Sequence, residues 1–328
     1  MSKPLLSIIV PVYNAEDYLS ETLNSVIDEK NNSDMEIILI NDGSSDSSLK
    51  ICEEYSKNYS FIKLISQKNQ GQSVARNVGI KHATGSWVTF VDSDDLVRKD
   101  YLSEMRRLIK NVNKNDIIMF RVKDFDKLAE IESDLSNETK LPIKRISKSE
   151  GMYQLTVKKG KNYLVNKVFP MHIVKDILLP IGRRYEDLAV VYKYFERAAN
   201  IYTCEEELYF YRQRVGSTTH LKTKDKLAKR NLMEDSIKSR KEQLNFFKRK
   251  NYEKAFQSAL FYYMLDKLQY LIVTDKYKLG RNEEYRNSQN FIRTYQPTLK
   301  RDGKFYIILG IYKVNPWLIR QMYKFIYR

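Results

Sequence analysis

The sequence has few of the features that mark several large classes of protein. It holds only 2 cysteines in 328 residues, Cys52 and Cys204, and neither lies in a metal-ligand spacing. Two isolated cysteines do not form a disulfide framework, and they favour a protein that functions in a reducing compartment. No G-x-G-x-x-G follows the first apolar run, which argues against a dinucleotide-binding dehydrogenase. We also find no internal repeat, so repeat architectures are not expected.

Long apolar runs are also missing from both ends of the sequence. The segment "MSKPLLSIIVPVYN" has a short apolar run interrupted by Pro11 and no small-residue cleavage site, unlike a signal peptide. Near the other end, the longest uncharged run is the eight residues Phe305–Tyr312. A membrane-spanning helix needs about 20. We therefore expect a cytoplasmic protein without a membrane span.

Acidic residues are scarce in the last third of the chain. The formal net charge is +16, and residues 220–328 carry +15 of it. A basic segment usually forms a solvated surface or binds a nucleic acid or an anionic membrane. No nucleic-acid recognition motif is present. After Asp302 basic and aromatic residues alternate with apolar ones at helical spacing: Val314, Trp317, Leu318, Met322, Phe325 and Ile326. This pattern favours an anionic membrane surface; a helix packed on the core and a dimer contact remain alternatives.

The first hundred residues alternate strand and helix patterns. The expected strands are four apolar runs rich in β-branched residues: Leu5–Val12, Met35–Asp42, Phe61–Ser66 and Trp87–Asp92. The expected helices lie between them, over residues 15–30, 44–59 and 71–85. Wholly apolar strands separated by helices predict a parallel sheet covered on both faces, with ligands at the carboxyl ends of its strands.

The rest of the chain is less regular. Residues 123–162 are polar and weakly periodic, so we expect a long connection or insertion. "LYFYRQR", Leu208–Arg214, alternates as a strand does. From about Lys224 the pattern is helical, with a strong apolar stripe over residues 252–272. The sequence therefore predicts an α/β fold with a mixed, mostly parallel sheet flanked by helices, followed by a C-terminal helical region.

Polar side chains stand where the predicted strands end. Asp92, Asp94 and Asp95 follow the fourth strand, and Asp42 ends the second. Clustered carboxylates repel one another, and a divalent cation offsets that cost. The Asp-x-Asp spacing directs Asp92 and Asp94 to one side, which suits Mn²⁺ or Mg²⁺ together with phosphate oxygens. Asp95 points elsewhere and is expected to cap the helix of "LVRKDYLSEM".

Taken together, these segments resemble the family 2 glycosyltransferases, inverting enzymes with a GT-A fold that act in bacterial cell-envelope or exopolysaccharide synthesis. The resemblance rests on "SIIVPVYNAEDYLSETLNSV", "INDGSSDSS", "KNQGQSVARNVGI" and "GSWVTFVDSDD", which occur in this order. "RRYEDLAVVYKYF" resembles the Glu-Asp motif of the family, and "YRQRVGSTT" a stretch that often follows it. The resemblance covers residues 1 to about 220.

The resemblance implies a site for a UDP-sugar donor. Pro11, Val12 and Tyr13 would cradle the uracil and ribose, and Asp42 would hydrogen-bond the uracil ring. Arg76 would lie near the nucleotide and help to neutralise the diphosphate. Asp42 and Arg76 also have ordinary explanations, as a turn residue and as a helix-surface residue.

It also implies the metal and catalytic roles. Asp92 would sit near the ribose and the metal, and Asp94 would bind the metal directly. Asp187 would be the general base that deprotonates the acceptor hydroxyl, with Glu186 supporting it or lining the acceptor site. Without the resemblance, Glu186 and Asp187 would be taken as the acidic first turn of a helix. Three further residues, Arg212, Arg214 and His220, are weaker candidates for contacts to phosphate or metal.

The expected domains follow from these observations. Residues 1–220 form the catalytic domain, with a nucleotide-binding half (1–100) and an acceptor-binding half (101–220). Residues 221–328 form a basic helical region that contacts a membrane surface or a second copy in a homo-oligomer. The acceptor would be a glycan or a polyprenyl-diphosphate-linked molecule, and the enzyme would lie at the inner face of the cell membrane.

Two other functions fit parts of the pattern. A nucleotide-sugar pyrophosphorylase, a nucleotidyltransferase, needs a Gly-rich basic loop after the first strand, where this chain has "VYNAEDY". A non-catalytic sugar-nucleotide-binding or scaffold protein on the same fold would be expected to lack Asp94 or Asp187, and both are present.

Overall fold

The computed structural model describes residues 3–27, 34–136, 140–157, 162–213 and 225–294, together with Gly310. The chain divides into two compact units, Met1–Ser217 and Thr218–Arg328. This division lies close to the boundary predicted between residues 220 and 221. Each unit has a buried apolar core of its own.

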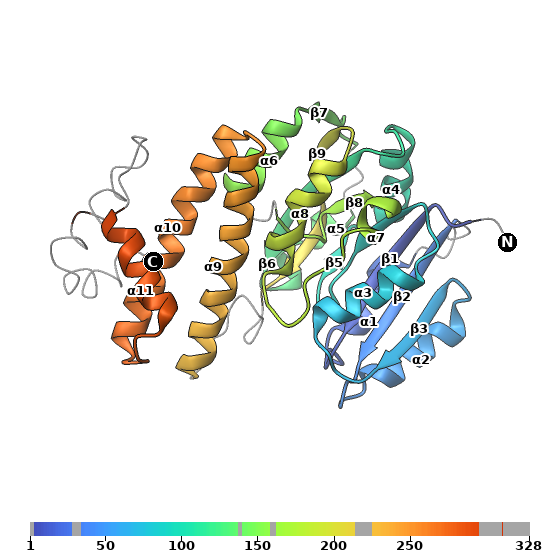
Figure 1. The fold of residues 1–328 in the computed structure, drawn as a ribbon. Helices are drawn as coiled ribbons and strands as arrows, with labels where there is room; N and C mark the ends of the chain where they lie inside the picture. The colour runs from blue at the N-terminus through green and yellow to red at the C-terminus, as the bar shows by residue number, and fades with distance from the viewer. Residues whose placement is uncertain are drawn as a thin grey trace. The chain divides into compact units, whose positions relative to one another are not determined.

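The first unit begins with four parallel strands in the order β3-β2-β1-β4 (Figure 1). They are β1 (Leu6–Val12), β2 (Met35–Asp42), β3 (Ile62–Gln67) and β4 (Trp87–Phe90). The helices between them are α1 (Leu19–Val26), α2 (Ser48–Asn58) and α3 (Gln72–His82). Right-handed crossovers place α1 and α2 on one face of the sheet and α3 on the other. The buried β1, β2 and β4 account for the apolar runs in the sequence.

The predicted boundaries of these elements differ from the observed ones mainly at the ends of the helices. The helix expected to end at Gly85 ends at His82 and is followed by Ala83 in an extended conformation. The fourth strand ends at Phe90 and not at Asp92. The segment from Asp92 to Asp95 is therefore a turn beyond the strand, where Asp92 and Asp94 are partly exposed and Asp95 is buried.

The second half of this unit extends the sheet with strands of mixed direction. These strands are β5 (Leu96–Val97), β6 (Ile117–Phe125), β7 (Lys144–Ile146), β8 (Lys167–Pro170) and β9 (Ile201–Arg212). β8 is antiparallel to β4 and β6, whereas β6 and β9 are parallel. The full order is β3-β2-β1-β4-β8-β6-β9-β5, with β7 on β9, so the predicted mixed, mostly parallel sheet is confirmed.

Helices accompany these strands. They are α4 (Tyr101–Lys110), η1 (Leu128–Glu130), α5 (Glu132–Leu135), α6 (Lys148–Val157), α7 (Met171–Lys175) and α8 (Glu186–Arg197). The prediction of a long connection over residues 123–162 is wrong in part, because this stretch contains the end of β6, β7, α5 and α6. These elements are short or pair with distant strands, so they leave little periodic signal.

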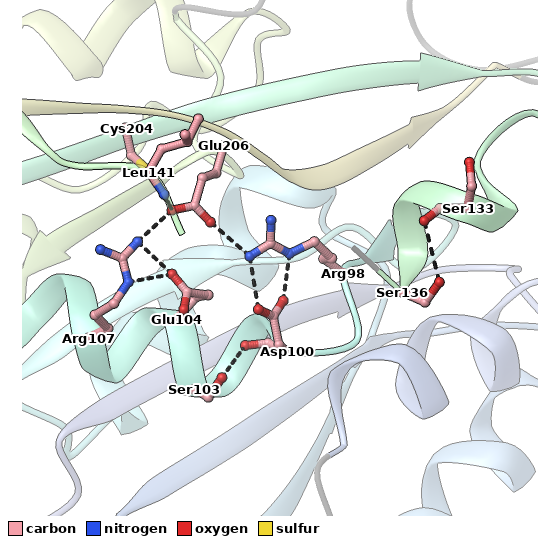
Figure 2. Close-up of polar contacts among 10 residues, drawn as sticks. All are labelled: Arg98, Asp100, Ser103, Glu104, Arg107, Ser133, Ser136, Leu141, Cys204 and Glu206. Carbon is pink, nitrogen blue, oxygen red and sulfur yellow. Dashed lines mark hydrogen bonds and ion pairs between the residues drawn. The ribbon is translucent and has the colours of Figure 1, made fainter. Parts of the chain in front are cut away.

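A buried network of charges anchors β9 against α4 (Figure 2). The Glu206 carboxylate on β9 accepts hydrogen bonds from Arg98 at 2.8 Å and from Arg107 at 2.5 Å. Arg98 also pairs with Asp100, and Arg107 with Glu104. Buried charges are tolerated only when they are paired in this way, so removing one partner is costly. The network holds β9 in register beside the turn that follows β4.

The second unit is helical. It consists of α9 (Lys226–Arg249), α10 (Glu253–Lys276) and α11 (Glu283–Thr294), so the predicted helical region is confirmed over these residues. Asp225 caps α9 through hydrogen bonds from the backbone of Leu227 and Ala228. Among the residues described, no helix combines the length and apolar character needed to cross a bilayer. The predicted amphipathic helix after Asp302 lies outside the described residues.

Candidate active site

The ends of three neighbouring strands meet at one edge of the sheet. β1 lies between β2 and β4, with Val12 opposite Asn41 and Ile9 opposite Phe90. Pro11 and Val12 are buried at the end of β1, and Tyr13, the next residue, is 50% exposed. An aromatic ring exposed beside polar strand ends is suited to stacking on a flat ligand.

Hydrogen bonds tie the loop after β1 to the loop after β2. Asn14 has a positive φ of 47°, and its side-chain oxygen accepts a bond from the backbone of Ser45 at 2.8 Å. The hydroxyl of Ser48 accepts from the backbone of Ala15 at the same distance. Asp46 accepts from the backbones of Glu16 and Ser48, and these bonds outweigh burial and lower its pKa. These hydrogen bonds fix the two loops against each other along one side of the site.

Asp42 joins β2 to the loop that precedes α3. Its buried carboxylate accepts hydrogen bonds from the side chain of Gln67 at 2.7 Å and from the backbones of Gln70 at 3.0 Å and Gly71 at 2.8 Å. Gly71 has a φ of 89°, a conformation that glycine adopts readily. Asp42 thus fixes the shape of this loop as well as lying at the predicted donor site.

Arg76 brings together two carboxylates from distant parts of the chain. It lies on α3, and its side chain is 5% exposed. One guanidinium nitrogen donates to Asp92 Oδ1 at 2.6 Å and another to Glu186 Oε1, 110 residues away in the sequence. Burial lowers the pKa of Arg76, but the charges of Asp92 and Glu186 outweigh it, so the pKa is raised overall. The guanidinium therefore stays charged at the centre of the site.

Two side chains of β9 hold the turn from Asp92 to Asp95. The Tyr209 hydroxyl accepts from the backbone of Asp92 at 3.1 Å and donates to the Asp95 carboxylate at 2.6 Å. The backbone of Arg212 donates to Asp95 at 2.8 Å, and its side chain donates to the carbonyl of Asp94 at 2.7 Å. Burial and the charges of Asp94 and Asp92 raise the pKa of Asp95.

These contacts correct one prediction. Asp95 does not cap a helix, because α4 begins at Tyr101, after Asp100; it is a buried anchor of the turn. Arg212 packs over the rings of Tyr18 and Phe125 and pairs with Glu21, and its contact with a phosphate or metal stays a prediction. The other two weaker candidates, Arg214 and His220, lie outside the described residues.

The arrangement of Asp92 and Asp94 fits a hard divalent cation. Both side chains are partly exposed, while Asp95 is withdrawn into the protein. Across the described ranges, no group of three or more His, Cys, Asp and Glu residues is placed to hold a metal. Mg²⁺ usually takes one or two carboxylates and completes its shell with phosphate oxygens and water. Asp92 and Asp94 therefore supply what a metal shared with a diphosphate requires.

Asp187 lies in the first turn of α8, beside Glu186. Tyr185, which precedes the helix, has a left-handed φ of 58°, a strained conformation for a bulky residue. Burial, followed by the charge of Glu186, raises the pKa of Asp187 to about 7, although Arg76 and Lys167 act in the opposite direction. A carboxylate with a pKa near neutrality is well matched to proton transfer at physiological pH.

The structure adds a pair of tyrosines that the sequence analysis did not identify. Tyr163, in the loop before β8, stacks on Tyr211 of β9 with ring centroids 5.8 Å apart and an angle of 29° between the planes. Burial raises the pKa of Tyr163, and the charges of Tyr211, Asp187 and two other aspartates add to this rise. Tyr163 therefore lies within electrostatic range of Asp187. Tyr163 belongs to no motif and meets Tyr211 only through the fold.

Comparison with known proteins identifies related sequences. The family model for glycosyl transferase family 2 matches residues 7–177. Glycosyltransferase GlyA of Streptococcus pneumoniae serotype 4 is 31% identical over 225 residues, which are 66% of this chain but 32% of GlyA. The chain thus spans about a third of the length of this relative.

Solved structures share the fold. TarS residues 1–349 of S. aureus, in complex with UDP-GlcNAc, align with 88% of this chain and 91% of that one, at a TM-score of 0.56 and 20% identity. The mannosyltransferase PcManGT from Pyrobaculum calidifontis, in complex with GDP-Man and Mn²⁺, aligns with 96% of this chain and 88% of its own, at a TM-score of 0.54 and 14% identity. The fold is that of the GT-A glycosyltransferases.

Proposed function

Since the chain belongs to glycosyl transferase family 2, we propose that it transfers a hexose or an N-acetylhexosamine from a UDP-sugar to a hydroxyl of a glycan or lipid-linked acceptor. The observation that carries this proposal is the position of Arg76 between Asp92 and Glu186. It joins the strand ends suited to a nucleotide to the helix that bears Asp187. A donor site and a proton acceptor are thus adjacent.

The donor lies along the ends of β1, β2 and β4 in this proposal. Pro11, Val12 and Tyr13 flank the uracil and ribose, and Asp42 lies at the edge of the base. The partly exposed ring of Tyr13 supports this placement, as do the preformed loops beside it. TarS, with the same fold, binds UDP-GlcNAc, and PcManGT binds GDP-Man, so the fold accepts more than one nucleotide.

The diphosphate lies at Asp92, Asp94 and Arg76. Asp94 and Asp92 would hold Mn²⁺ or Mg²⁺, which would supply positive charge to the leaving diphosphate. Arg76 adds a fixed positive charge that is already oriented by its two carboxylate partners. Charge placed in advance stabilises the transition state without reorganisation at the moment of reaction.

Asp187 acts as the general base. The acceptor oxygen attacks the anomeric carbon as the bond to the UDP oxygen breaks, and the acceptor proton passes to the Asp187 carboxylate. Attack opposite the leaving group inverts the anomeric configuration. Base assistance of this kind contributes roughly 10²–10⁴-fold to the rate. Glu186, held by Arg76, keeps the pKa of Asp187 high through its negative charge.

We place this reaction in cell-envelope or exopolysaccharide synthesis, at the cytoplasmic face of the membrane. The relatives that the chain matches are bacterial glycosyltransferases, which supports this setting. The net charge of +15 on residues 220–328 suits an anionic surface. Polymer chains and sugars linked to polyprenyl diphosphate would both offer acceptor hydroxyls there.

Calorimetric titration of UDP with and without Mn²⁺ tests the donor site. We expect the wild type to bind UDP more tightly with Mn²⁺, and Asp94→Ala to lose the metal-dependent part. Asp126→Ala, an exposed aspartate on another loop, is the matched control and should behave as the wild type. If the wild type binds no UDP with or without metal, the UDP donor is excluded. A panel of UDP-sugars, scored by release of UDP, then identifies the sugar.

A further inference from the structure

An apolar cavity of about 410 Å³ lies where α3 packs against the segment around α7. Figure 1 shows the two helices beside each other. Its apolar lining comes from Val74, Val78, Ile80 and Leu178. On α3 the cavity residues Val74 and Val78 point away from Arg76, since they lie half a helical turn from it. The part of the cavity that they line is therefore on the opposite side of α3 from Arg76.

The two most exposed large apolar side chains of the described residues are Leu178, which lines this cavity, and Ile181, three residues further along the chain. Leu178 is 52% exposed and Ile181 is 69% exposed. The backbone between them is fixed, because Leu179 exchanges two hydrogen bonds of 2.9 Å with the side chain of Asn77 on α3. A fixed segment that presents large aliphatic groups to water is characteristic of a contact surface.

A second cavity, of about 340 Å³, shares Lys175 with the first. Its other charged or titratable lining groups are Lys3, Lys114 and His172, and Lys81 lines the first cavity. Within the described ranges, Lys3, Lys81 and Lys114 form no ion pair. Like charges gathered without partners favour an anionic ligand.

The carboxylates near these lysines are already engaged. Glu36, below the second cavity, is buried and paired with Lys63, and it accepts bonds from Thr84 and Gly85. Asp176, the residue after α7, pairs with Arg197. The lysines therefore leave a net positive charge beside the apolar lining of the first cavity, and the Nζ of Lys175 also donates a hydrogen bond to the carbonyl of Ala83 at 3.1 Å.

We propose that this surface, formed by the two cavities with Leu178 and Ile181 and called the α3–α7 face, docks on an anionic phospholipid membrane. Aliphatic side chains would enter the boundary of the acyl chains, and the lysines would remain among the headgroup phosphates. A nucleic acid would match the lysines but would leave the apolar groove exposed. An apolar protein partner would match the groove but would leave the lysines without anionic partners.

This docking has a consequence for the site. Ile181 and Glu186 are five residues apart, so their Cα atoms are separated by at most about 18 Å. The membrane surface would thus lie within reach of the Glu186–Asp187 pair and could deliver a membrane-borne acceptor. That consequence rests on the proposed function, whereas docking itself does not.

Co-sedimentation of the full chain with vesicles tests the proposal. The vesicles contain phosphatidylglycerol and phosphatidylcholine in equal amounts, or phosphatidylcholine alone. We expect binding to the anionic vesicles only. Each lysine near an anionic surface contributes about fivefold to the partition coefficient. The triple variant Lys81→Gln/Lys114→Gln/Lys175→Gln should therefore reduce it by on the order of 100-fold, and Leu178→Ser/Ile181→Ser by tenfold or more.

Matched controls change the same residue types on other parts of the first unit. They are Lys50→Gln/Lys57→Gln/Lys99→Gln, which removes three exposed lysines, and Leu128→Ser/Leu141→Ser, which removes two exposed leucines. Both should bind as the wild type. The proposal is overturned if the controls lose as much vesicle binding as the variants of the α3–α7 face. It is also overturned if the wild type does not bind anionic vesicles. Binding that is lost only in Lys313→Gln/Arg320→Gln/Lys324→Gln assigns the membrane contact to the tail instead.

If the glutamine or serine variants fold poorly, a fluorescence measurement tests the proposal instead. Ile181→Trp places an indole at the most exposed apolar position, and Leu128→Trp is its control. A blue shift on adding anionic vesicles, present in Ile181→Trp and absent in Leu128→Trp, supports docking. Equal spectra in the two variants overturn it. UDP titration of the same samples keeps this test separate from the proposed function, because loss of vesicle binding with intact UDP binding rejects only the docking surface.

Discussion

Arg76 on α3 donates to Glu186 at the start of α8 while its other nitrogen is held by Asp92. The contact connects the two halves of the first unit across 110 residues of sequence. It also sets the electrostatics of the site, because the positive charge of Arg76 lowers the pKa of Asp187 and the negative charge of Glu186 raises it.

Replacing Arg76 should therefore change both stability and the pH dependence of activity. Arg76→Met leaves Asp92 and Glu186 without their partner in a partly buried place, and we expect a loss of about 1–4 kcal/mol in the free energy of unfolding. The pKa of Asp187 should rise further, so activity should need a higher pH. Urea denaturation and a pH–rate profile measure these two effects.

The control for this substitution is Arg121→Met. Arg121 pairs with Glu207 at the surface, where ion pairs contribute about 0–1 kcal/mol. Its pH profile should match that of the wild type. An Arg76→Met variant as stable as Arg121→Met, with an unchanged profile, would show that the bridge has no role in the site.

Asp187 should limit both activity at low pH and stability at high pH. As a general base it must be ionised, so the rate should rise with pH through about 7. Its pKa is about 7 in the folded protein against 3.8 for the ordinary carboxyl, so between these values the folded state holds a proton that the unfolded state has lost. Stability from this group is thus present below pH 4 and is lost as the pH rises to about 7.

Asp187→Asn removes this titration. We expect an inactive protein whose free energy of unfolding, relative to the wild type, increases between pH 5 and pH 8 by on the order of 1–3 kcal/mol. Urea denaturation at the two pH values measures the change. Glu150→Gln, a partly exposed glutamate in the first turn of α6, is the control and should show no such increase. A constant difference between Asp187→Asn and wild type at both pH values would contradict the raised pKa.

The first four strands could be predicted because burial of a strand leaves a pattern in its own local sequence. A strand covered on both faces must be apolar along its whole length, and the sequences of β1, β2 and β4 meet that requirement. The helices between them have enough apolar residues on one face to be recognised. Their ends depend on one or two capping contacts and were placed less well, as at His82.

The details of the site could not be predicted, because they depend on contacts between distant residues. Nothing near Asp95 in the sequence indicates that Tyr209 and Arg212 hold it from more than 110 residues away. The short β7 and β8 likewise gain their pairing from the rest of the sheet. The alternation in "LYFYRQR" did indicate a strand, but it could not show which turn that strand supports.

Tyr209 should control the shape of the turn from Asp92 to Asp95, which we propose holds the metal. Tyr209→Phe keeps the ring but removes the hydroxyl that links the backbone of Asp92 to the carboxylate of Asp95. We expect a loss of about 1–3 kcal/mol in the free energy of unfolding and weaker Mn²⁺-dependent binding of UDP. Thermal melting and calorimetric titration measure the two effects.

The control for Tyr209→Phe is Tyr101→Phe. Tyr101 is also fully buried, but its hydroxyl contacts Thr89 below the sheet and not the turn. It should lose stability without losing metal-dependent UDP binding. If both variants bind UDP and Mn²⁺ as the wild type does, the turn does not depend on the Tyr209 hydroxyl.

The stacked rings of Tyr163 and Tyr211 should position the acceptor, because Tyr163 lies within electrostatic range of Asp187, the proposed base, and aromatic rings offer flat apolar surfaces for packing. Tyr163→Leu removes the stack, whereas Tyr163→Phe keeps it. We expect the leucine variant to raise the KM for the acceptor by roughly 2- to 12-fold, with the KM for the UDP-sugar unchanged. The phenylalanine variant should keep both values. Steady-state kinetics separate the two substrates, and an equal rise in both KM values would assign the pair to the fold and not to the acceptor.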